Sequence, residues 1–322
     1  MTEDQGGQRG FSDAFMAPGL GHNARLSRID AAVDWQPFSR LLRRLRSPLG
    51  RRGYDPLVLY KAQLLAQWYQ LSDPGLEEAL LDRLSFRRFC GLGTMDATPD
   101  ETTFVRFRAA LVRHALGPKL FAELNRQLEQ QGLVVKSGTL IDASLVQAAA
   151  DVRKGEDGGK VTKDPEAGFA QAKGKAFYGY KMHIGVDRDS GLVRRTLLTP
   201  ANVHESTVAD SVICGDEAVV YADKGYDSRA RRQALAEAGI ADGVMYARRP
   251  GPKNPGGVQP RWQVELNKAL SPIRAAVEKV FGTLKRSYGY RRVRYLGLER
   301  NSSHLYLLMT ALNLRRLERL LA

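Results

Sequence analysis

The hydrophobic residues of this 322-residue chain change their spacing once, at Leu133. Before that position, apolar residues recur about every three or four places, which is the spacing of an amphipathic helix. After it come short apolar and β-branched runs of strand length, such as residues 139–141. Two such patterns in one chain predict an all-helical domain followed by a mixed α/β domain.

Start and stop signals divide the first part into separate helices. The first two expected helices cover residues 35–45 and 57–68. A third starts at Asp73-Pro74 and a fourth at a capping box over residues 98–101. The last starts at Gly117-Pro118 and ends at Gly132. We therefore predict a flexible lead over residues 1–28, a helical domain over residues 29–132 and a second domain over residues 133–322.

The second domain alternates strands and helices. The expected strands lie at residues 133–135, 139–141, 178–186, 192–198, 218–221 and 243–247, and the expected helices at residues 229–238, 273–285 and 304–321. The lysine- and glycine-rich segment 151–175 has few large apolar residues, so we expect it to be mobile.

The charge balance indicates the class of partner. The chain has 49 Lys and Arg against 35 Asp and Glu, a formal net charge of +14. Such a surface attracts polyanions, so nucleic acid is the favoured partner and an anionic membrane the weaker alternative. Only Cys90 and Cys214 are present, and no apolar run approaches the length of a membrane span, so we expect a soluble, cytoplasmic protein without a disulfide framework or leader peptide.

Three acidic residues lie at positions where a carboxylate is expected to have a specific structural or functional role. Asp142 lies within an apolar strand, where it serves as a structural ion-pair partner or as a ligand. Asp223 follows the next apolar strand, and its alternative role is a helix N-cap, for which Asp227 competes. Glu278 lies on the predicted helix 273–285, where Arg274 and Lys285 fall within roughly 40° of it on the helical wheel. A solvated salt-bridging face is the alternative for this trio.

Carboxylates that converge from separate segments have a definite chemical use. Mg²⁺ prefers oxygen ligands, and Mn²⁺ can substitute for it. Two such ions held a few ångströms apart can activate a water or a 3′ hydroxyl on one side of a phosphodiester and stabilise the leaving oxygen on the other.

The motifs of the chain resemble those of the DDE transposases of bacterial insertion sequences, in particular the group named after insertion sequence five. The resemblance runs from about residue 54 to residue 317, and its most specific segments are residues 139–144, 178–183, 199–205, 221–226 and 273–282. The metal ligands of that family fall on Asp142, Asp223 and Glu278. Its Arg-x₃-Glu-x₆-Lys signature falls on Arg274, Glu278 and Lys285. Where the full signature has a tyrosine, this chain has Ser271, which puts any role for that tyrosine in doubt.

The resemblance implies an RNase H-like catalytic domain preceded by an all-helical domain that recognises the inverted repeats at the element ends. Arg43 and Arg44 belong to an arginine-dense stretch suited to phosphate contacts, although a solvated helix face is an equal alternative. A second basic run contains Arg291 and Arg292 with tyrosines interleaved at 288, 290 and 295, which favours a DNA track with stacking surfaces.

Three other residues have weaker signals. His183 and His204 lack metal-ligand spacing, and structural hydrogen bonding is the favoured role for both. Trp262 either stacks on a DNA base or packs within the protein.

The sequence thus predicts a bacterial, nucleoid-associated DDE transposase that cleaves double-stranded DNA at element ends and joins the 3′ ends to target DNA. The need to pair two ends indicates a homodimer on DNA. The alternatives are an RNase H-like nuclease or resolvase, which cuts without joining, and a non-catalytic DNA-binding regulator.

Overall fold

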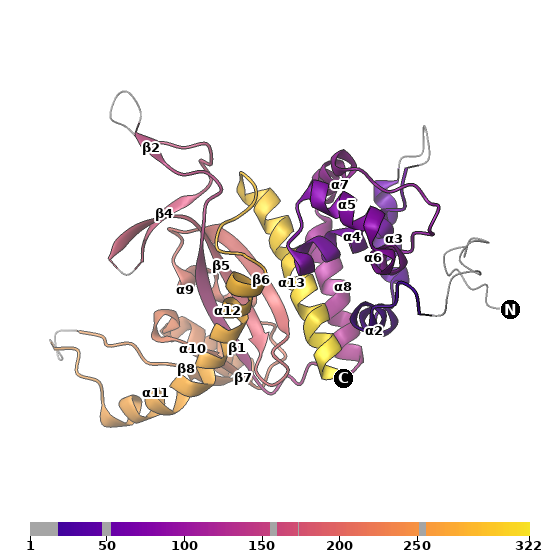
Figure 1. The fold of residues 1–322 in the computed structure, drawn as a ribbon. Coiled ribbons are helices and arrows are strands. Elements are labelled where there is room, and N and C mark those ends of the chain that lie inside the picture. The colour runs from indigo at the N-terminus through magenta and orange to yellow at the C-terminus, as the bar shows by residue number, and fades with distance from the viewer. Residues whose placement is uncertain (1–18, 47–52, 155–159, 173, 251–255) are drawn as a thin grey trace. The chain divides into compact units, whose positions relative to one another are not determined.

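The computed structural model describes residues 19–46, 53–154, 160–172, 174–250 and 256–322 (Figure 1). The chain forms two compact units. The first comprises Met1–Gln130 and Tyr306–Ala322, and the second comprises Gln131–Leu305. The last helix, α13 (Leu298–Leu320), therefore contributes residues to both units. Among the described residues, no helix has the length and apolar character needed to cross a membrane.

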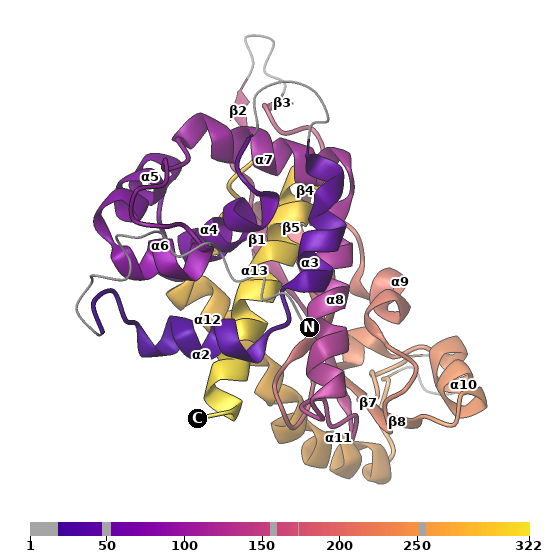
Figure 2. The ribbon, with the colours of Figure 1, turned by 90° about the vertical axis from the view of Figure 1, so that its right-hand side faces the viewer.

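The first unit is helical, as predicted. Its elements are α2 (Ala24–Ala32), α3 (Gln36–Leu42) with the 3₁₀ turn η1 (Arg43–Leu45), α4 (Pro56–Tyr69), α5 (Asp73–Asp82), α6 (Leu84–Cys90), α7 (Glu101–Arg113) and α8 (Leu116–Gln130). The C-terminal part of α13 runs beside α8 (Figure 2). Trp68 of α4 is 8% exposed and donates its indole N–H to the Ala311 carbonyl at 2.9 Å, which fixes α4 against α13.

Two helix ends of the first unit compare directly with the sequence signals. Gly132 has a φ of 69°, as expected of a helix stop. The predicted capping box starting at Thr98 is wrong, because α7 is capped by Asp100, whose carboxylate accepts the Thr103 N–H at 2.7 Å. The Thr98 hydroxyl instead accepts a hydrogen bond from the buried Arg87 at 2.8 Å.

The second unit is built on a mixed sheet. Its strands are β1 (Thr139–Gln147), β4 (Gly168–Ala172), β5 (Lys175–Asp187), β6 (Val193–Pro200), β7 (Val219–Ala222) and β8 (Ala241–Val244). The order is β4-β5-β1-β7-β8, with β6 also paired to β5. Pairing is antiparallel from β4 to β1 and parallel from β1 through β7 to β8. The predicted mixed α/β class is thereby confirmed.

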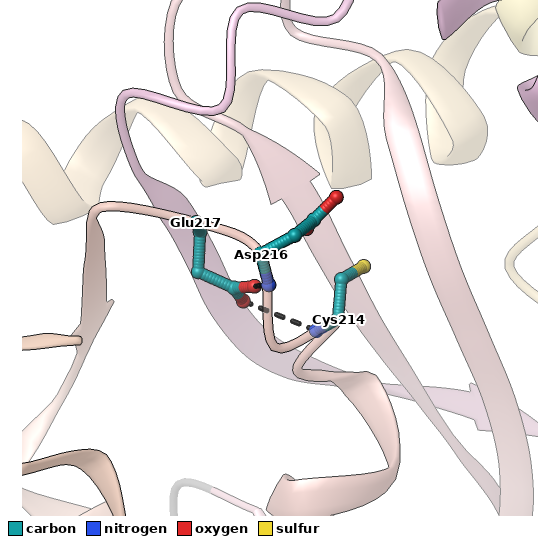
Figure 3. A group of neighbouring side chains, drawn as sticks. All are labelled: Cys214, Asp216 and Glu217. Atoms are coloured by element: carbon teal, nitrogen blue, oxygen red, sulfur yellow. Dashed lines mark hydrogen bonds between the residues drawn. The ribbon is translucent and has the colours of Figure 1, made fainter. Parts of the chain in front are cut away.

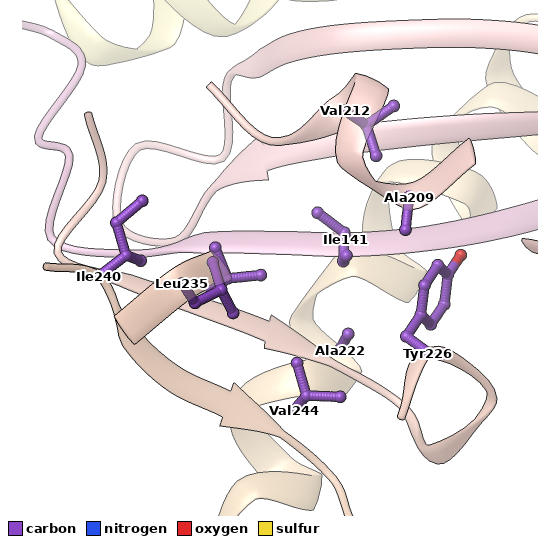
Figure 4. Packing of buried hydrophobic residues seen from close by; sticks show 9 residues of the cluster. Ile141, Ala209, Val212, Ala222, Tyr226, Leu235, Ile240 and Val244 are labelled. Carbon is purple, nitrogen blue, oxygen red and sulfur yellow. The ribbon is translucent and has the colours of Figure 1, made fainter. Parts of the chain in front are cut away.

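One face of this sheet carries an apolar core (Figure 4). The core joins residues of β1, β7 and β8 to η2 (Ala209–Val212), η3 (Lys224–Tyr226) and α10 (Arg229–Glu237). The short helix α9 (Glu205–Val208) directly precedes η2. Side chains alternate between the two faces of a strand, so Asp142 and Ser144 point to the other face. Both contact the helical segment formed by α11 (Arg261–Arg274), η4 (Ala275–Val277) and α12 (Glu278–Ser287).

Two predicted strands differ in the structure. Residues 133–135 form no strand, because Lys136 adopts a φ of 59° and interrupts the extended run before Thr139. The strand predicted at residues 243–247 ends at Val244. Met245 still donates its N–H to the Ala222 carbonyl, but the N–H groups of Tyr246 and Ala247 donate to the side chains of Asn267 and Asp227.

The segment 151–175 has more regular structure than its composition indicated. The short strands β2 (Arg153–Lys154) and β3 (Lys160–Val161) pair with each other, and β4 pairs with β5. Asp164 is fully buried and accepts hydrogen bonds from the Tyr180 hydroxyl at 2.7 Å and the Gly297 N–H at 3.0 Å. Residues 155–159 and 173 lie outside the described part of the chain, and the mobility of the segment stays a prediction.

The helix that carries Glu278 starts earlier than expected. Ser271-Pro272 predicted a start, but α11 begins at Arg261 and includes Pro272 in its last turn. Proline lacks the N–H that an α-helical bond needs. The helix tightens into the 3₁₀ turn η4 directly after it and resumes as α12 at Glu278.

Candidate active site

The structure brings Asp142 and Asp223 to one face of two neighbouring strands. Leu140 of β1 pairs with Tyr221 of β7, and each acid follows two residues later. Asp223 also caps η3, since its Oδ1 accepts the Gly225 N–H at 2.6 Å. The structure therefore confirms the alternative N-cap role of Asp223, and the N-cap hydrogen bond uses only Oδ1 of its carboxylate.

Arg274 connects two of the three predicted acids. Its guanidinium donates from Nη1 to Asp142 Oδ2 at 3.1 Å and from Nη2 to Glu278 Oε1 at 2.9 Å. The Arg274 side chain is 19% exposed, whereas that of Glu278 is 62% exposed. Arg274 therefore does not lie on a solvated helix face, because it reaches from α11 to the middle strand of the sheet.

Lys285 extends the same line of contacts along β1. Its ammonium group donates to the Ser144 hydroxyl at 2.7 Å. Burial, and next the positive charge of Arg291, lowers the pKa of Lys285. A cation is thus held beside the strand that carries Asp142, where it is suited to meet an anionic ligand.

Asp142 is a largely buried carboxylate with two other acids nearby, and its pKa is raised. Burial is the largest cause that raises its pKa, which reaches about 6. The Ala143 N–H and Arg274 act in the opposite direction, while the negative charges of Asp223 and Glu205 raise it further. Crowded carboxylates of this kind are stabilised by a bound cation.

Glu205 is a nearby acid to which the sequence analysis assigned no role. Its Oε1 lies 3.3 Å from the ammonium nitrogen of Lys181. The buried Tyr226 hydroxyl reports the proximity of the acids, because its pKa is raised by burial first and then by Asp142, Glu205 and Asp223. The only sequence signal was that Glu205 closes the segment 199–205.

The two histidines have structural hydrogen bonds, as their spacing favoured. His183 is 1% exposed, and its Nε2 lies 2.9 Å from the Thr199 hydroxyl. Burial lowers its pKa to about 4, so it is neutral at physiological pH. His204 caps α9, with its Nδ1 accepting the Ser206 N–H.

Four of the basic residues predicted to contact DNA, namely Arg43, Arg44, Arg291 and Arg292, are exposed. Arg43 and Arg44 lie on η1 in the first unit, and Arg51 and Arg52 of the same stretch lie outside the described residues. In the second unit, Arg291 and Arg292 are exposed beyond α12, and Arg292 pairs with Asp151 at 2.9 Å.

Two tyrosines of the second basic run pack on His304. Tyr290 is 2% exposed and packs edge-on against His304, with ring centroids 5.7 Å apart. Tyr295 packs on the same histidine at 5.5 Å. The stacking role predicted for Tyr290 is therefore wrong, because its ring belongs to the core.

Trp262 is 56% exposed at the start of α11. Its ring meets Tyr246 edge-on at 5.1 Å, and the guanidinium of Arg232 stacks on the Tyr246 ring at 3.7 Å. The packing role is thus visible, while much of the indole remains open to solvent.

A second group of potential metal ligands lies elsewhere in this unit (Figure 3). Glu217 accepts the backbone N–H groups of Cys214, Gly215 and Asp216. Asp216 pairs with Arg194 and Lys136. These contacts engage both carboxylates, so the group is a stabilised turn rather than a metal centre.

Two families match the chain. The family described as Transposase DDE domain matches residues 135–314, which is more than half of the sequence, and the Transposase domain (DUF772) matches residues 17–110. The chain belongs to the DDE transposases. Its mixed sheet and flanking helices are accordingly an RNase H-like fold, as predicted. The substrate of this family is DNA, and its members generally use divalent metal ions.

Proposed function

We propose that this DDE transposase binds the inverted-repeat ends of its own insertion sequence, cleaves them and joins the 3′ ends to target DNA in the bacterial nucleoid. We place it in the insertion-sequence-five group. The observation that supports the proposal best is the guanidinium of Arg274, which joins Asp142 to Glu278 beside the strand pair that leads to Asp223.

The donor set fits a pair of Mg²⁺ ions, with Mn²⁺ able to substitute. Asp142, Asp223 and Glu278 are all carboxylates, the ligand type that hard divalent cations prefer. When bound, the ions supply Lewis acidity to the attacking and leaving oxygens of a phosphodiester. Burial of Asp142 keeps bulk water from screening its charge.

Arg274 and Lys285 are the phosphate-binding residues of the proposed site. A guanidinium can hold a phosphate in two-point geometry, while an ammonium acts as a point charge. Both groups project from the α11–α12 segment to β1, where they meet Asp142 and Ser144. They are therefore placed to hold the DNA backbone near the acids.

Recognition of the element ends is assigned to the helical domain, residues 29–132, after a lead over residues 1–28. The exposed Arg43 and Arg44 contact phosphates there. Arg291 and Arg292 extend the phosphate track of the catalytic domain, residues 133–322. A homodimer on DNA pairs the two ends.

A cleavage and joining assay tests this function. The full chain is incubated with labelled duplexes that carry the inverted repeats flanking its gene, with a target plasmid and Mg²⁺. We expect 3′-end joining by the wild-type protein, its loss in Asp142→Asn, and unchanged joining in Glu237→Gln, an exposed control on α10. Cleavage without joining would favour a nuclease or resolvase, and binding without cleavage a regulator.

A further inference from the structure

Lys285 differs from Arg274 in the charge of its partner. The guanidinium of Arg274 donates to two carboxylates of the candidate site. The ammonium group of Lys285 donates instead to a neutral hydroxyl, that of Ser144, at 2.7 Å. Among the described residues, Lys285 forms no ion pair with an acid, and the neighbouring charge that affects its pKa is the positive one of Arg291. No carboxylate of the described chain therefore offsets the charge of Lys285.

The backbone on both sides of this contact is anchored. Leu284, which directly precedes Lys285 on α12, is fully buried. The chain beyond α12 then joins the end of β1, because the Gln147 N–H donates to the Arg291 carbonyl at 2.9 Å. Ser144 and Lys285 are thus carried by two segments that are hydrogen-bonded to each other close to the contact.

A serine hydroxyl can fix a lysine side chain without neutralising it. The hydroxyl accepts one N–H of the ammonium group, and the other N–H donors stay available to a ligand. A lysine side chain has many rotamers, and it loses less entropy on binding when a contact already holds it in place. A phosphate that reaches Lys285 therefore meets a cation that Ser144 has oriented in advance.

The position of the contact along β1 suits a DNA backbone that also reaches Asp142. Ser144 and Asp142 are two residues apart on this strand, so they share a face of the sheet and lie about 7 Å apart along it. Each DNA strand carries a phosphate about every 3.4 Å of helix axis. A strand with one phosphate at Asp142 thus has another within reach of Lys285.

We propose that Ser144 is a positioning residue, which holds the ammonium group of Lys285 for a DNA phosphate beside the metal site. This inference rests on the proposed function, because Lys285 belongs to the proposed phosphate-binding residues. It predicts that Ser144 affects DNA binding through Lys285 alone.

The test measures the affinity of the full chain for end DNA by filter binding at several salt concentrations. EDTA is present, so that bound metal does not contribute. We expect Ser144→Ala to weaken binding by up to about tenfold, since a hydrogen bond to a charged group is lost. Ser144→Thr keeps the hydroxyl and is expected to bind like the wild type. Ser211→Ala, an exposed serine of η2, is the matched control and should change nothing.

The double variant of Ser144→Ala and Lys285→Ala decides the mechanism. It is expected to bind as weakly as Lys285→Ala alone and with the same salt slope, because the hydroxyl then has no lysine to hold. Losses that add up in the double variant would overturn the inference. So would a folded Ser144→Thr that binds as weakly as Ser144→Ala. If Ser144 only packs within the protein, Ser144→Ala lowers the melting temperature and leaves DNA affinity unchanged, which would also overturn it.

The same measurements separate this inference from the proposed function. Wild-type affinity and salt slope in Lys285→Ala would contradict the proposed phosphate contact itself. Weakened binding by Lys285→Ala together with wild-type binding by Ser144→Ala would contradict only the positioning role of Ser144.

Discussion

Replacement of Glu278 by Gln separates chemistry from stability. The Glu278 side chain is 62% exposed and pairs with Arg274 at 2.9 Å within the same helical segment. Exposed pairs four residues apart contribute only about 0.3–0.5 kcal/mol, so the variant is expected to unfold almost as the wild type does. As a metal ligand, however, Glu278 supplies a negative charge. Gln keeps the shape of the side chain but lacks this charge. Strand cleavage should fall at least about a hundredfold, or ~2.7 kcal/mol in the activation barrier.

The assay follows cleavage of end DNA by Glu278→Gln at matched Mg²⁺, with filter binding and thermal unfolding on the same preparations. DNA affinity should hold or rise, because a negative charge near the DNA is removed. Lys285→Ala is the contrasting variant. It loses a phosphate contact, which should weaken DNA binding and reduce the salt dependence by about one unit, with a smaller effect on cleavage of bound DNA. Near-wild-type cleavage by Glu278→Gln would refute the assignment of this residue as a metal ligand.

Three other outcomes are expected. Because the pKa of Asp142 is raised from 3.8 to about 6, the folded state binds more protons than the unfolded chain between these values, and this residue lowers stability as pH rises through them. Asp142→Asn should therefore melt above the wild type at about pH 7 with chelator present, and the difference should shrink at about pH 4; an equal difference at both would contradict the raised pKa. Replacing Arg43 and Arg44 together by Ala in the full chain should reduce the salt slope of end-DNA binding by about two, and an unchanged slope in filter binding would exclude phosphate contacts there. Gly225→Ala should lower Mn²⁺ affinity in calorimetry because its β-carbon would lie 2.9 Å from Asp223 Oδ1. Gly256→Ala should not, because its β-carbon would make only an ordinary contact, 3.7 Å from a side-chain carbon of Val258.

The sequence indicated the neighbourhood of Asp142 and Asp223 and that of Arg274 and Glu278 better than their surroundings, and the metal-binding role of the acids stays a proposal. Asp142 lies in one strand pattern and Asp223 follows another, and each acid is two residues beyond the paired residues Leu140 and Tyr221. The helical wheel correctly grouped Arg274 with Glu278, but it treated the segment as one regular helix. The 3₁₀ turn η4 directly before Glu278 breaks that regularity, and Arg274 faces the sheet while Glu278 faces solvent.

The missed features depend on contacts between distant parts of the chain. Asp164 is buried and accepts hydrogen bonds from Tyr180 and Gly297. No local sequence pattern predicts a buried acid in a Lys- and Gly-rich segment. Tyr290 has the spacing of a DNA-stacking residue, yet it is buried against His304. Composition describes what a segment can do alone, whereas these residues acquire their roles from tertiary packing.

The location of the bound metal is the most direct test of the account. With Fe²⁺ in place of Mg²⁺, peroxide and ascorbate generate hydroxyl radicals that cut the polypeptide close to the ion, and mass spectrometry maps the cuts. We expect cuts beside Asp142, Asp223 and Glu278 that excess Mg²⁺ suppresses. Cuts confined to the turn of Cys214, Asp216 and Glu217, or cuts that Mg²⁺ does not suppress, would contradict a metal-dependent transposase site on this face of the sheet.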